Sequence, residues 1–371
     1  MLVGVPKEIK SSEYRVGLTP SAVGEYVAHG HKVLVETGAG AGIGATDAAY
    51  VAAGASIAAS AADVFAKADM IVKVKEPQPV EWKQLRAGQI LFTYLHLAAD
   101  APQALGLMAS GVTAVAYETV TDARGHLPLL APMSEVAGRL SVQAAATALQ
   151  KATGGRGILL GGVPGVPPGK VVIIGGGVVG THAATVAAGI GAIVTILDKS
   201  LPRLRELDDM FEGRVVTRYA ARDAFAEEVA GADAVIGAVL VPGAAAPKLV
   251  TRAMLATMKP GSVLVDVAID QGGCFETSHA TTHLDPTYVV DGIVHYCVAN
   301  MPGAVPLTSS AALNHATLPF GLALADKGLA AIAADPHLRN GLNVHAGKIT
   351  HKAVAESLHL DFSDPGKLMA A

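Results

Sequence analysis

The sequence predicts an α/β fold of two Rossmann-like, doubly wound parallel-sheet domains, with the active site expected in the cleft between them. Short β-branched runs alternate along the chain with alanine-rich amphipathic segments, which is typical of parallel strands covered by helices. One of these runs leads directly into a glycine-rich turn. The chain has 371 residues, of which 51% are hydrophobic and 16% charged, so its length and composition suit about two domains with large apolar cores.

The predicted strands fall into two blocks. In the first block we expect strands near Leu2–Val5, Lys32–Glu36, Met70–Val74, Ile90–Tyr94 and Val112–Ala116. In the second block we expect strands near Val171–Ile174, Ile193–Leu197, Ala234–Ala238, Val263–Asp266 and Val294–Val298.

The segments between and after these blocks set the predicted domain boundaries. A helix is expected from Ser134, with Ser134 as its N-cap, and a Gly/Pro-rich connection, residues 154–169, then leads into the second block. The helical pattern of Thr308–Ala334 must pack outside the completed second domain. We therefore expect a discontinuous substrate domain, residues 1–128 and 307–371, and an NAD-binding domain, residues 129–306, that includes the linking helix.

The glycine-rich turn is the strongest functional signal in the chain. Gly175-Gly-Gly177-Val178-Val179-Gly180 follows a buried strand and opens a helix, as a dinucleotide-binding motif requires. The first glycine allows a tight turn, the second lets a pyrophosphate approach the backbone, and the third lets the helix pack closely on its strand. The free N–H groups and dipole of the helix amino end then favour the phosphates.

An acidic residue after the next strand indicates which dinucleotide is bound. Asp198 lies about 20 residues past the first glycine, where an acid binds the adenosine ribose hydroxyls, and this favours NAD over NADP. Arg203 is expected at the ribose or adenine. Because Lys199 and Arg203 are basic, some tolerance of a 2′-phosphate stays open.

Charge and composition argue against several other classes of protein. The formal net charge is −4 and the chain has no basic run, so nucleic acid is not an expected partner. Residues 171–197 are uncharged, but glycines interrupt them and they resolve into strand, helix and strand, so no membrane span is expected. Without a leader pattern or a disulfide framework, the chain is expected to be cytoplasmic with Cys274 and Cys297 reduced. We find no spacing typical of metal ligands and expect no metal.

Four chemically active residues follow predicted strands, where ligands of open α/β sheets bind. Arg15, Lys75 and His96 follow strands of the first block, and Asp270 follows a strand of the second. Each has an ordinary alternative: a solvated loop arginine, a surface pair with Glu76, a structural histidine and a turn cap, respectively. Their common position favours a site for a small charged acid but does not prove that they converge.

The residues around these positions resemble the L-alanine dehydrogenase and pyridine nucleotide transhydrogenase family over nearly the whole chain. The similar segments include Gly4-Val-Pro-Lys-Glu8, Glu13-Tyr-Arg15-Val-Gly-Leu-Thr-Pro20, Val72-Lys-Val-Lys75-Glu-Pro77 and Tyr94-Leu-His96 in the first part of the chain. Val265-Asp-Val-Ala-Ile-Asp270 and His295-Tyr-Cys-Val-Ala-Asn300 extend the likeness. Because Lys75, His96 and the Asp270 segment are all present, the alanine dehydrogenase branch is favoured. The chain departs from the family's usual residues at Ser12, Gly17 and His182.

The resemblance implies reversible oxidative deamination of L-alanine by NAD to pyruvate, ammonium and NADH. Arg15 would bind the substrate carboxylate through its planar fork, and Lys75 would hold the carboxylate or polarise the carbonyl oxygen. His96 would exchange protons near neutrality, and Asp270 would orient the water or amine and share the proton transfer. Which of these two dominates stays open.

Several cofactor contacts are implied residue by residue, in addition to Gly175, Gly177 and Gly180 of the turn. They are Ser134, Val178, Val179, Asp198, Arg203, Ala220, Val239, Leu240, Val267, Asp270, Val298, Asn300 and Met301. Ala220 stands where the family often has serine, and Met301 is also expected to pack near the substrate.

Two other functions stay in view, a transhydrogenase-type NAD-binding subunit and a noncatalytic NAD-binding protein. The expected partners are small molecules, namely L-alanine, pyruvate and ammonium. The resemblance also implies a homo-oligomer, specifically a hexamer.

Overall fold

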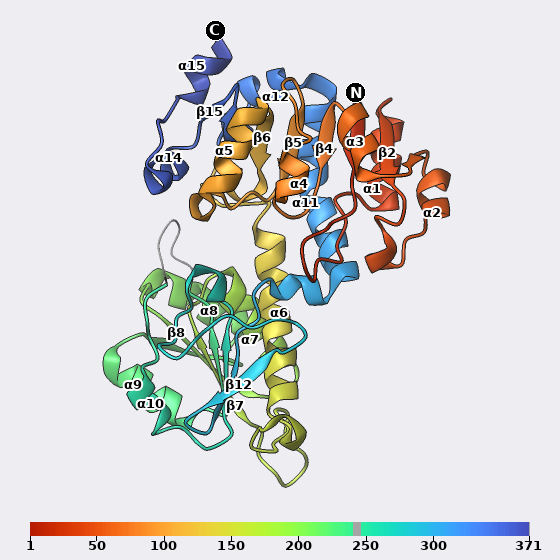
Figure 1. The fold of residues 1–371 in the computed structure, drawn as a ribbon. Coiled ribbons are helices and arrows are strands. Elements are labelled where there is room, and N and C mark those ends of the chain that lie inside the picture. The colour runs from red at the N-terminus through yellow and green to blue at the C-terminus, as the bar shows by residue number, and fades with distance from the viewer. Residues whose placement is uncertain (240–245, 371) are drawn as a thin grey trace. The chain divides into compact units, whose positions relative to one another are not determined.

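The computed structural model describes residues 1–239 and 246–370. The chain divides into two compact units, of which the first comprises residues 1–133 and 305–371 and the second residues 134–304. The first unit is therefore built from both ends of the chain, the red-to-orange and blue parts of Figure 1. Each unit contains a sheet with helices packed against it.

The first unit has an eight-stranded sheet in the order β15-β14-β6-β5-β4-β1-β2-β3. Its strands are β1 (Leu2–Val5), β2 (Lys32–Glu36), β3 (Ser56–Ala58), β4 (Met70–Val72), β5 (Ile90–Thr93), β6 (Thr113–Ala116), β14 (Leu342–His345) and β15 (Lys348–Ile349). Its helices are α1 (Pro20–Ala28), α2 (Asp47–Ala52), α3 (Ala61–Lys67), α4 (Pro79–Trp82), α5 (Ala101–Ser110), α11 (Pro306–Lys327), α12 (Leu329–Ala334), α13 (Pro336–Arg339), α14 (Lys352–Leu358) and α15 (Pro365–Ala370).

The second unit has a seven-stranded sheet in the order β12-β13-β11-β10-β7-β8-β9. Its strands are β7 (Lys170–Ile174), β8 (Ile193–Asp198), β9 (Val216–Tyr219), β10 (Ala234–Gly237), β11 (Val263–Asp266), β12 (Thr287–Val290) and β13 (Ile293–Tyr296). Its helices are α7 (Val178–Gly189), α8 (Leu201–Phe211), α9 (Arg222–Gly231) and α10 (Arg252–Leu255), while α6 (Ala131–Ala148) runs across the division between the units.

Alternate residues of β7 face two different cores, which explains why both faces of this sheet are covered. Val171 and Ile173 pack with the α7 alanines, including Ala183. Val172 and Ile174 pack in a separate cluster that includes Val229 of α9. A parallel strand buried on both faces needs the near-continuous apolar run that the sequence shows there.

The predicted fold class is confirmed, with differences in detail at the sheet edges. The pairs β14–β6, β14–β15 and β12–β13 are antiparallel, so each sheet is mixed rather than purely parallel. Antiparallel edge strands are common additions to doubly wound sheets. The strands β3, β9, β12, β14 and β15 were not predicted from the sequence, because they lack a continuous apolar run.

Of two expectations about helices, the N-cap at Ser134 is wrong, whereas the helical pattern of Thr308–Ala334 is confirmed with one break. The linking helix begins at Ala131, so Ser134 lies inside it rather than capping it. The expected helix Thr308–Ala334 begins earlier, at Pro306, and is interrupted at Gly328, which separates α11 from α12. Gly328 has a φ of 55° and a ψ of −133°, a conformation that only glycine adopts readily, so the chain changes direction there.

Candidate active site

Three of the predicted site residues follow strands at the centre of the first unit. Arg15 lies in the long segment after β1, Lys75 follows β4 and His96 follows β5. The sheet order β5-β4-β1 makes these three strands neighbours, and all three are parallel. Because the carboxyl ends of parallel strands meet at one edge of a sheet, the three loops emerge at the same edge.

Arg15 is not a solvated loop residue, since it is only 2% exposed. Its Nε and Nη2 donate to the two carboxylate oxygens of Glu13 at 2.7 and 2.6 Å, and its Nη1 lies 3.0 Å from the Met133 sulfur. Burial by itself would lower the pKa of Arg15, but the hydrogen bonds and charge of Glu13 outweigh that effect and raise it. The guanidinium is therefore a fixed, permanently charged group.

The pair with Glu13 changes how Arg15 could contact a substrate. The sequence analysis expects the fork of Arg15 to hold the substrate carboxylate by two parallel hydrogen bonds. In the structure the Nε–Nη2 edge holds Glu13 in that bidentate way instead. The role of Glu13 as the partner of Arg15 was not predicted from the sequence, although an acid two positions before the arginine was a signal for it.

The segment that carries Lys75 is held by a buried network of charged side chains. Lys73 is fully buried, and its Nζ lies 3.2 Å from Glu8 and 2.8 Å from Glu81. The other oxygen of Glu8 accepts the backbone N–H of Val74 at 2.7 Å. Burial raises the pKa of Glu8, against the opposing charge of Lys73. An ionic cluster this deep must be well paired to be tolerated, and here it fixes the backbone beside Lys75.

Lys75 itself is half-buried, and its carbonyl oxygen accepts the hydroxyl of Thr93 at 3.1 Å. The neighbouring Glu76 forms an ion pair with Lys10. Burial would raise the pKa of Glu76, but the charges of Lys75 and Lys10 and the hydrogen bond from Lys10 hold it below its ordinary value. The predicted surface pair of Lys75 and Glu76 is thus part of a larger charged cluster.

His96 is exposed and begins the 3₁₀ turn η2 (Leu97–Ala99). Its imidazole lies nearly parallel to the ring of Tyr94, with centroids 5.7 Å apart and planes 8° from parallel. Tyr94 is buried, and its hydroxyl donates to the Leu129 carbonyl at 2.6 Å. An exposed imidazole can exchange protons with a bound molecule.

The glycine turn of the second unit has the shape that a pyrophosphate requires. Gly175 has a φ of 103°, and a Cβ atom at Gly180 would lie 1.8 Å from the Gly175 carbonyl oxygen. Gly177 is the N-cap of α7, so the amino end of that helix begins at the turn, and Val178 and Val179 are its first residues. Because Gly175 has a left-handed backbone and Gly180 has no room for a side chain, the turn suits the close approach of a dinucleotide cofactor.

Asp198 and Arg203 brace the glycine turn from the end of β8 and from α8. One oxygen of Asp198 accepts the Gly176 N–H at 2.7 Å and the other accepts the Ser200 N–H at 2.8 Å. Arg203 donates to the Gly176 carbonyl at 2.7 Å and to the Thr181 hydroxyl at 2.8 Å. A carboxylate can accept about four hydrogen bonds, so Asp198 retains capacity for a ribose hydroxyl.

The other predicted cofactor residues lie at different depths of the second unit. Ala220 is buried, and its N–H donates to the Asp198 carbonyl at 2.9 Å. Val298 and Met301 are buried, whereas Ser134, Val239, Val267 and Asn300 are half-buried. Asn300 has a φ of 60°, an uncommon conformation for a residue other than glycine. Leu240 lies outside the described residues.

Asp270 is exposed, in the 3₁₀ turn η5 (Ile269–Gln271) that follows β11. The loop around it is organised by Asp266, which is fully buried and accepts the N–H groups of Ala268 at 3.1 Å and Cys274 at 2.9 Å. Lys248 adds hydrogen bonds from its Nζ to the carbonyls of Gly272 and Gly273. Asp266 is a second organising carboxylate that the sequence analysis read only as the end of a strand.

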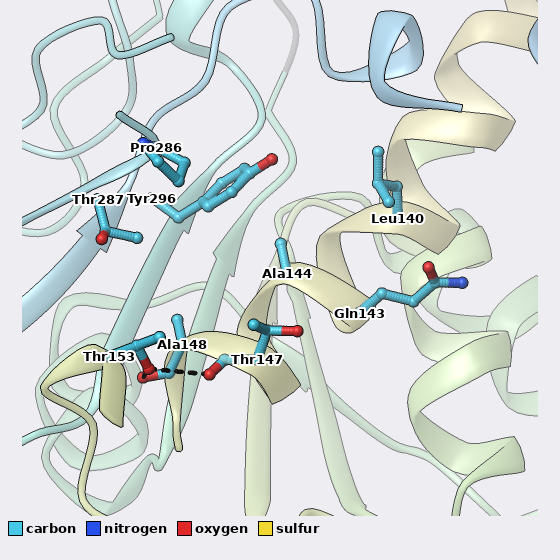
Figure 2. Close-up of a pocket in the computed structure, with 9 residues that line it drawn as sticks. All are labelled: Leu140, Gln143, Ala144, Thr147, Ala148, Thr153, Pro286, Thr287 and Tyr296. Carbon is cyan, nitrogen blue, oxygen red and sulfur yellow. Dashed lines mark hydrogen bonds between the residues drawn. The ribbon is translucent and has the colours of Figure 1, made fainter. Parts of the chain in front are cut away.

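A pocket of about 300 Å³ lies elsewhere on the second unit, between α6 and the β12–β13 hairpin (Figure 2). It is lined by Leu140, Gln143, Ala144, Thr147, Ala148, Thr153, Pro286, Thr287 and Tyr296. None of the predicted site residues lines it. The described residues contain no group of three or more His, Cys, Asp or Glu side chains placed to hold a metal, and no helix among them is long and apolar enough to cross a membrane.

Family models cover both units. The model of the alanine dehydrogenase/PNT N-terminal domain matches residues 4–137, and that of the C-terminal domain matches residues 141–352. An alanine dehydrogenase from Halomonas elongata is 61% identical over 370 residues, and one from Mycolicibacterium smegmatis is 55% identical over 371 residues, with both chains of each pair fully covered.

Solved structures give the same picture. An L-alanine dehydrogenase with 54% identity superposes with a TM-score of 0.94, over 97% of this chain and 99% of the other. A transhydrogenase from Sinorhizobium meliloti is more distant, with 27% identity and a TM-score of 0.82 over 95% of this chain and 100% of the other.

Proposed function

Because the chain belongs to the alanine dehydrogenase/PNT family, we propose that its site residues carry out the NAD-dependent oxidative deamination of L-alanine. In this reaction L-alanine, NAD⁺ and water give pyruvate, ammonium, NADH and a proton, and the reverse reaction aminates pyruvate. The observation that carries the assignment is identity of 53% or more to full-length alanine dehydrogenases, together with Arg15, Lys75, His96 and Asp270 at strand ends.

We propose that the first unit binds the substrate and the second binds NAD. NAD supplies the hydride acceptor at nicotinamide C4, and hydride transfer requires the substrate Cα to meet that atom. The glycine turn Gly175–Gly180 and Asp198 would hold the pyrophosphate and the adenosine ribose. Ser134, Asn300 and Met301 would contact the nicotinamide side, and Arg203 would act chiefly through the turn that it braces.

Arg15 would contribute its fixed positive charge to binding of the substrate carboxylate, while Glu13 holds one edge of the guanidinium. The Glu13 pair also fixes the guanidinium plane, so little side-chain entropy is lost when a carboxylate binds. Lys75 would place a compact positive charge on the carbonyl oxygen of pyruvate and so polarise the carbonyl for attack by ammonia.

His96 would carry the protons of the carbinolamine steps. In the deamination direction it would accept a proton from the attacking water and later return one to the leaving amine. Asp270, exposed on its turn, would orient that water or the amine. Both residues would therefore act on the substrate, while the charge cluster under Lys75 keeps the neighbouring backbone in place.

The test is the initial rate of NADH oxidation at 340 nm with pyruvate and ammonium, compared with reactions that lack ammonium or use NADPH. We expect turnover that requires ammonium and prefers NADH. NADH binding without turnover would instead favour the transhydrogenase-like or noncatalytic alternatives. We also propose a cytoplasmic homo-hexamer, as the family resemblance implies, and light scattering after size-exclusion chromatography would measure the subunit number.

A further inference from the structure

His96 has a left-handed backbone conformation, with a φ of 51° and a ψ of 34°. Residues with a Cβ atom adopt this conformation rarely, and it persists only where surrounding contacts determine it. The imidazole is exposed, so burial of the side chain does not hold the residue in place. Hydrogen bonds to the backbone can hold His96 in this conformation instead.

Glu118 makes such a contact. It lies in the 3₁₀ turn η3 (Tyr117–Thr119), directly after β6, and β6 is the neighbour of β5 in the sheet. Its Oε1 accepts the backbone N–H of His96 at 2.6 Å, and both of its carboxylate oxygens lie 3.2 Å from the backbone nitrogen of Leu95. Two successive amides thus converge on one carboxylate, and hydrogen bonds to an ionised acceptor are the strong ones.

The residues just before His96 are fixed by other side chains. Gln103, which is fully buried, donates from its Nε2 to the Leu95 carbonyl at 2.8 Å. Tyr94 is held by the hydrogen bond that its hydroxyl donates to the Leu129 carbonyl. These contacts position the end of β5, but the contact with Glu118 is the one that reaches the amide of His96 itself.

The titratable neighbour of Glu118 is His351, at the start of α14. Burial lowers the pKa of His351 and outweighs the opposing attraction of Glu118. Burial thus disfavours the charged form of this imidazole. Burial raises the pKa of the Tyr94 hydroxyl, and the Glu118 charge adds to this effect.

We propose that Glu118 is a positioning residue for the reaction, because its carboxylate holds the Leu95 and His96 amides and so sets the direction of the His96 imidazole. This inference rests on the proposed function, in which His96 transfers protons. Glu118 itself contacts backbone atoms rather than the imidazole, so it acts through His96.

The experiment compares Glu118→Ala, Glu118→Gln, His96→Ala and the double variant Glu118→Ala/His96→Ala. It measures kcat with saturating NADH, pyruvate and ammonium, and the NADH Kd by fluorescence. We expect Glu118→Ala to lower kcat roughly 10- to 100-fold, the range that a misplaced catalytic group produces, with an unchanged NADH Kd. Glu118→Gln keeps a carbonyl acceptor for the His96 amide and should retain more activity. The double variant should be no slower than His96→Ala alone.

A matched control is Asp335→Ala in the same unit. The Asp335 carboxylate also accepts a backbone N–H, that of His337 at 2.8 Å, but it serves the start of α13. We expect this variant to keep the wild-type kcat, so a fall there equal to that of Glu118→Ala would overturn the inference.

The outcomes separate the inference from the function on which it rests. Additive losses in the double variant, or wild-type kcat in Glu118→Ala, would overturn the positioning role while leaving that of His96 intact. Wild-type kcat in His96→Ala would remove the role of His96, and the inference would fall with it. If Glu118→Ala does not fold, Glu118→Gln in the wild-type and His96→Ala backgrounds provides the same comparison.

Discussion

The two units share the order of six consecutive strands but hold their site loops in different ways. The order β3-β2-β1-β4-β5-β6 in the first unit corresponds to β9-β8-β7-β10-β11-β13 in the second. In the second unit the turn after the first strand depends on glycines such as Gly180, where any side chain would collide with the backbone. In the first unit, carboxylates of Glu13, Glu8 and Glu118 accept the backbone N–H groups of the loops that carry Arg15, Lys75 and His96.

This difference matches what each loop has to do. A glycine turn removes side chains so that a pyrophosphate can approach backbone N–H groups. A loop that presents a charged or titratable side chain cannot use glycine at that position, so other contacts must fix its backbone. The carboxylates supply it, and they add negative charge that keeps Arg15 and Lys73 protonated.

The largest expected effect is on turnover. His96→Ala should lower kcat by roughly 10² to 10⁴, the usual loss when a general acid/base is removed, with nearly unchanged NADH binding. Steady-state rates and NADH fluorescence measure the two quantities. His126→Ala, an exposed histidine of the same unit paired with Asp122, is the control and should keep full activity. Wild-type turnover in His96→Ala would show that His96 is not the general acid/base of the reaction.

The next effect concerns the stability of the first unit. Lys73→Met leaves Glu8 and Glu81 buried without their cation, and breaking a buried pair in this way costs about 3–5 kcal/mol. Urea unfolding measures the change in free energy. Lys67→Met is the matched control, because its pair with Asp63 is exposed and such pairs contribute at most about 1 kcal/mol. An equal loss of unfolding free energy in the two variants would show that the buried network stabilises the unit no more than an exposed pair does.

A smaller effect is expected at the glycine turn. Gly180→Ala places a methyl group against the backbone of the turn, and overpacking of this kind costs about 1–3 kcal/mol. If this strain opposes the conformation that binds NADH, the NADH Kd should rise roughly 10- to 100-fold. Gly189→Ala, at the other end of α7, meets no atom within 4 Å and is the control. This control should leave the NADH Kd unchanged. An unchanged Kd in Gly180→Ala would contradict the claim that the cofactor turn has no room for a side chain at this position.

The smallest effect is a pH dependence of the unfolding free energy that arises from His182 on α7. Its Nδ1 accepts from Arg139 at 3.1 Å, and Glu135 lies 3.9 Å from its Nε2. Burial, together with Arg139, lowers the pKa of His182 below its ordinary 6.5 despite Glu135. The folded state therefore binds this proton less readily than the unfolded state, so stability is complete above pH 6.5 and decreases as the pH falls below it.

His182→Asn tests this, because asparagine can still accept from Arg139 but does not titrate. Unfolding free energies measured from pH 7.5 down to about 5 should fall less steeply in the variant than in the wild type. The same slope in both proteins would exclude a contribution from His182.

The sequence predicts some parts of the molecule better than others for a physical reason. The glycine turn, its strand and Asp198 are specified by residues close together in the chain, so spacing alone identifies them. The central parallel strands are buried on both faces and leave continuous apolar runs. By contrast, the contacts from Glu8 to Val74 and from Glu118 to His96 join residues far apart in the chain. Spacing cannot reveal such contacts before the strand order is known.

Two of the sequence predictions failed because of residues close by in the chain. Ser134 looks like an N-cap, but the helix begins at Ala131 because the preceding residues continue the same turn. The fork of Arg15 looks suited to a substrate, yet Glu13, only two residues away, occupies one edge of it.

The most direct test of the division between the units is a paired measurement on Arg15→Lys and Asp198→Ala, giving the pyruvate KM and the NADH Kd of each. Lysine cannot form the two-point pair with Glu13, so Arg15→Lys should raise the pyruvate KM and leave the NADH Kd unchanged. Asp198→Ala should raise the NADH Kd, reduce the preference for NADH over NADPH and leave the pyruvate KM unchanged. Changes in both constants in both variants would contradict the account.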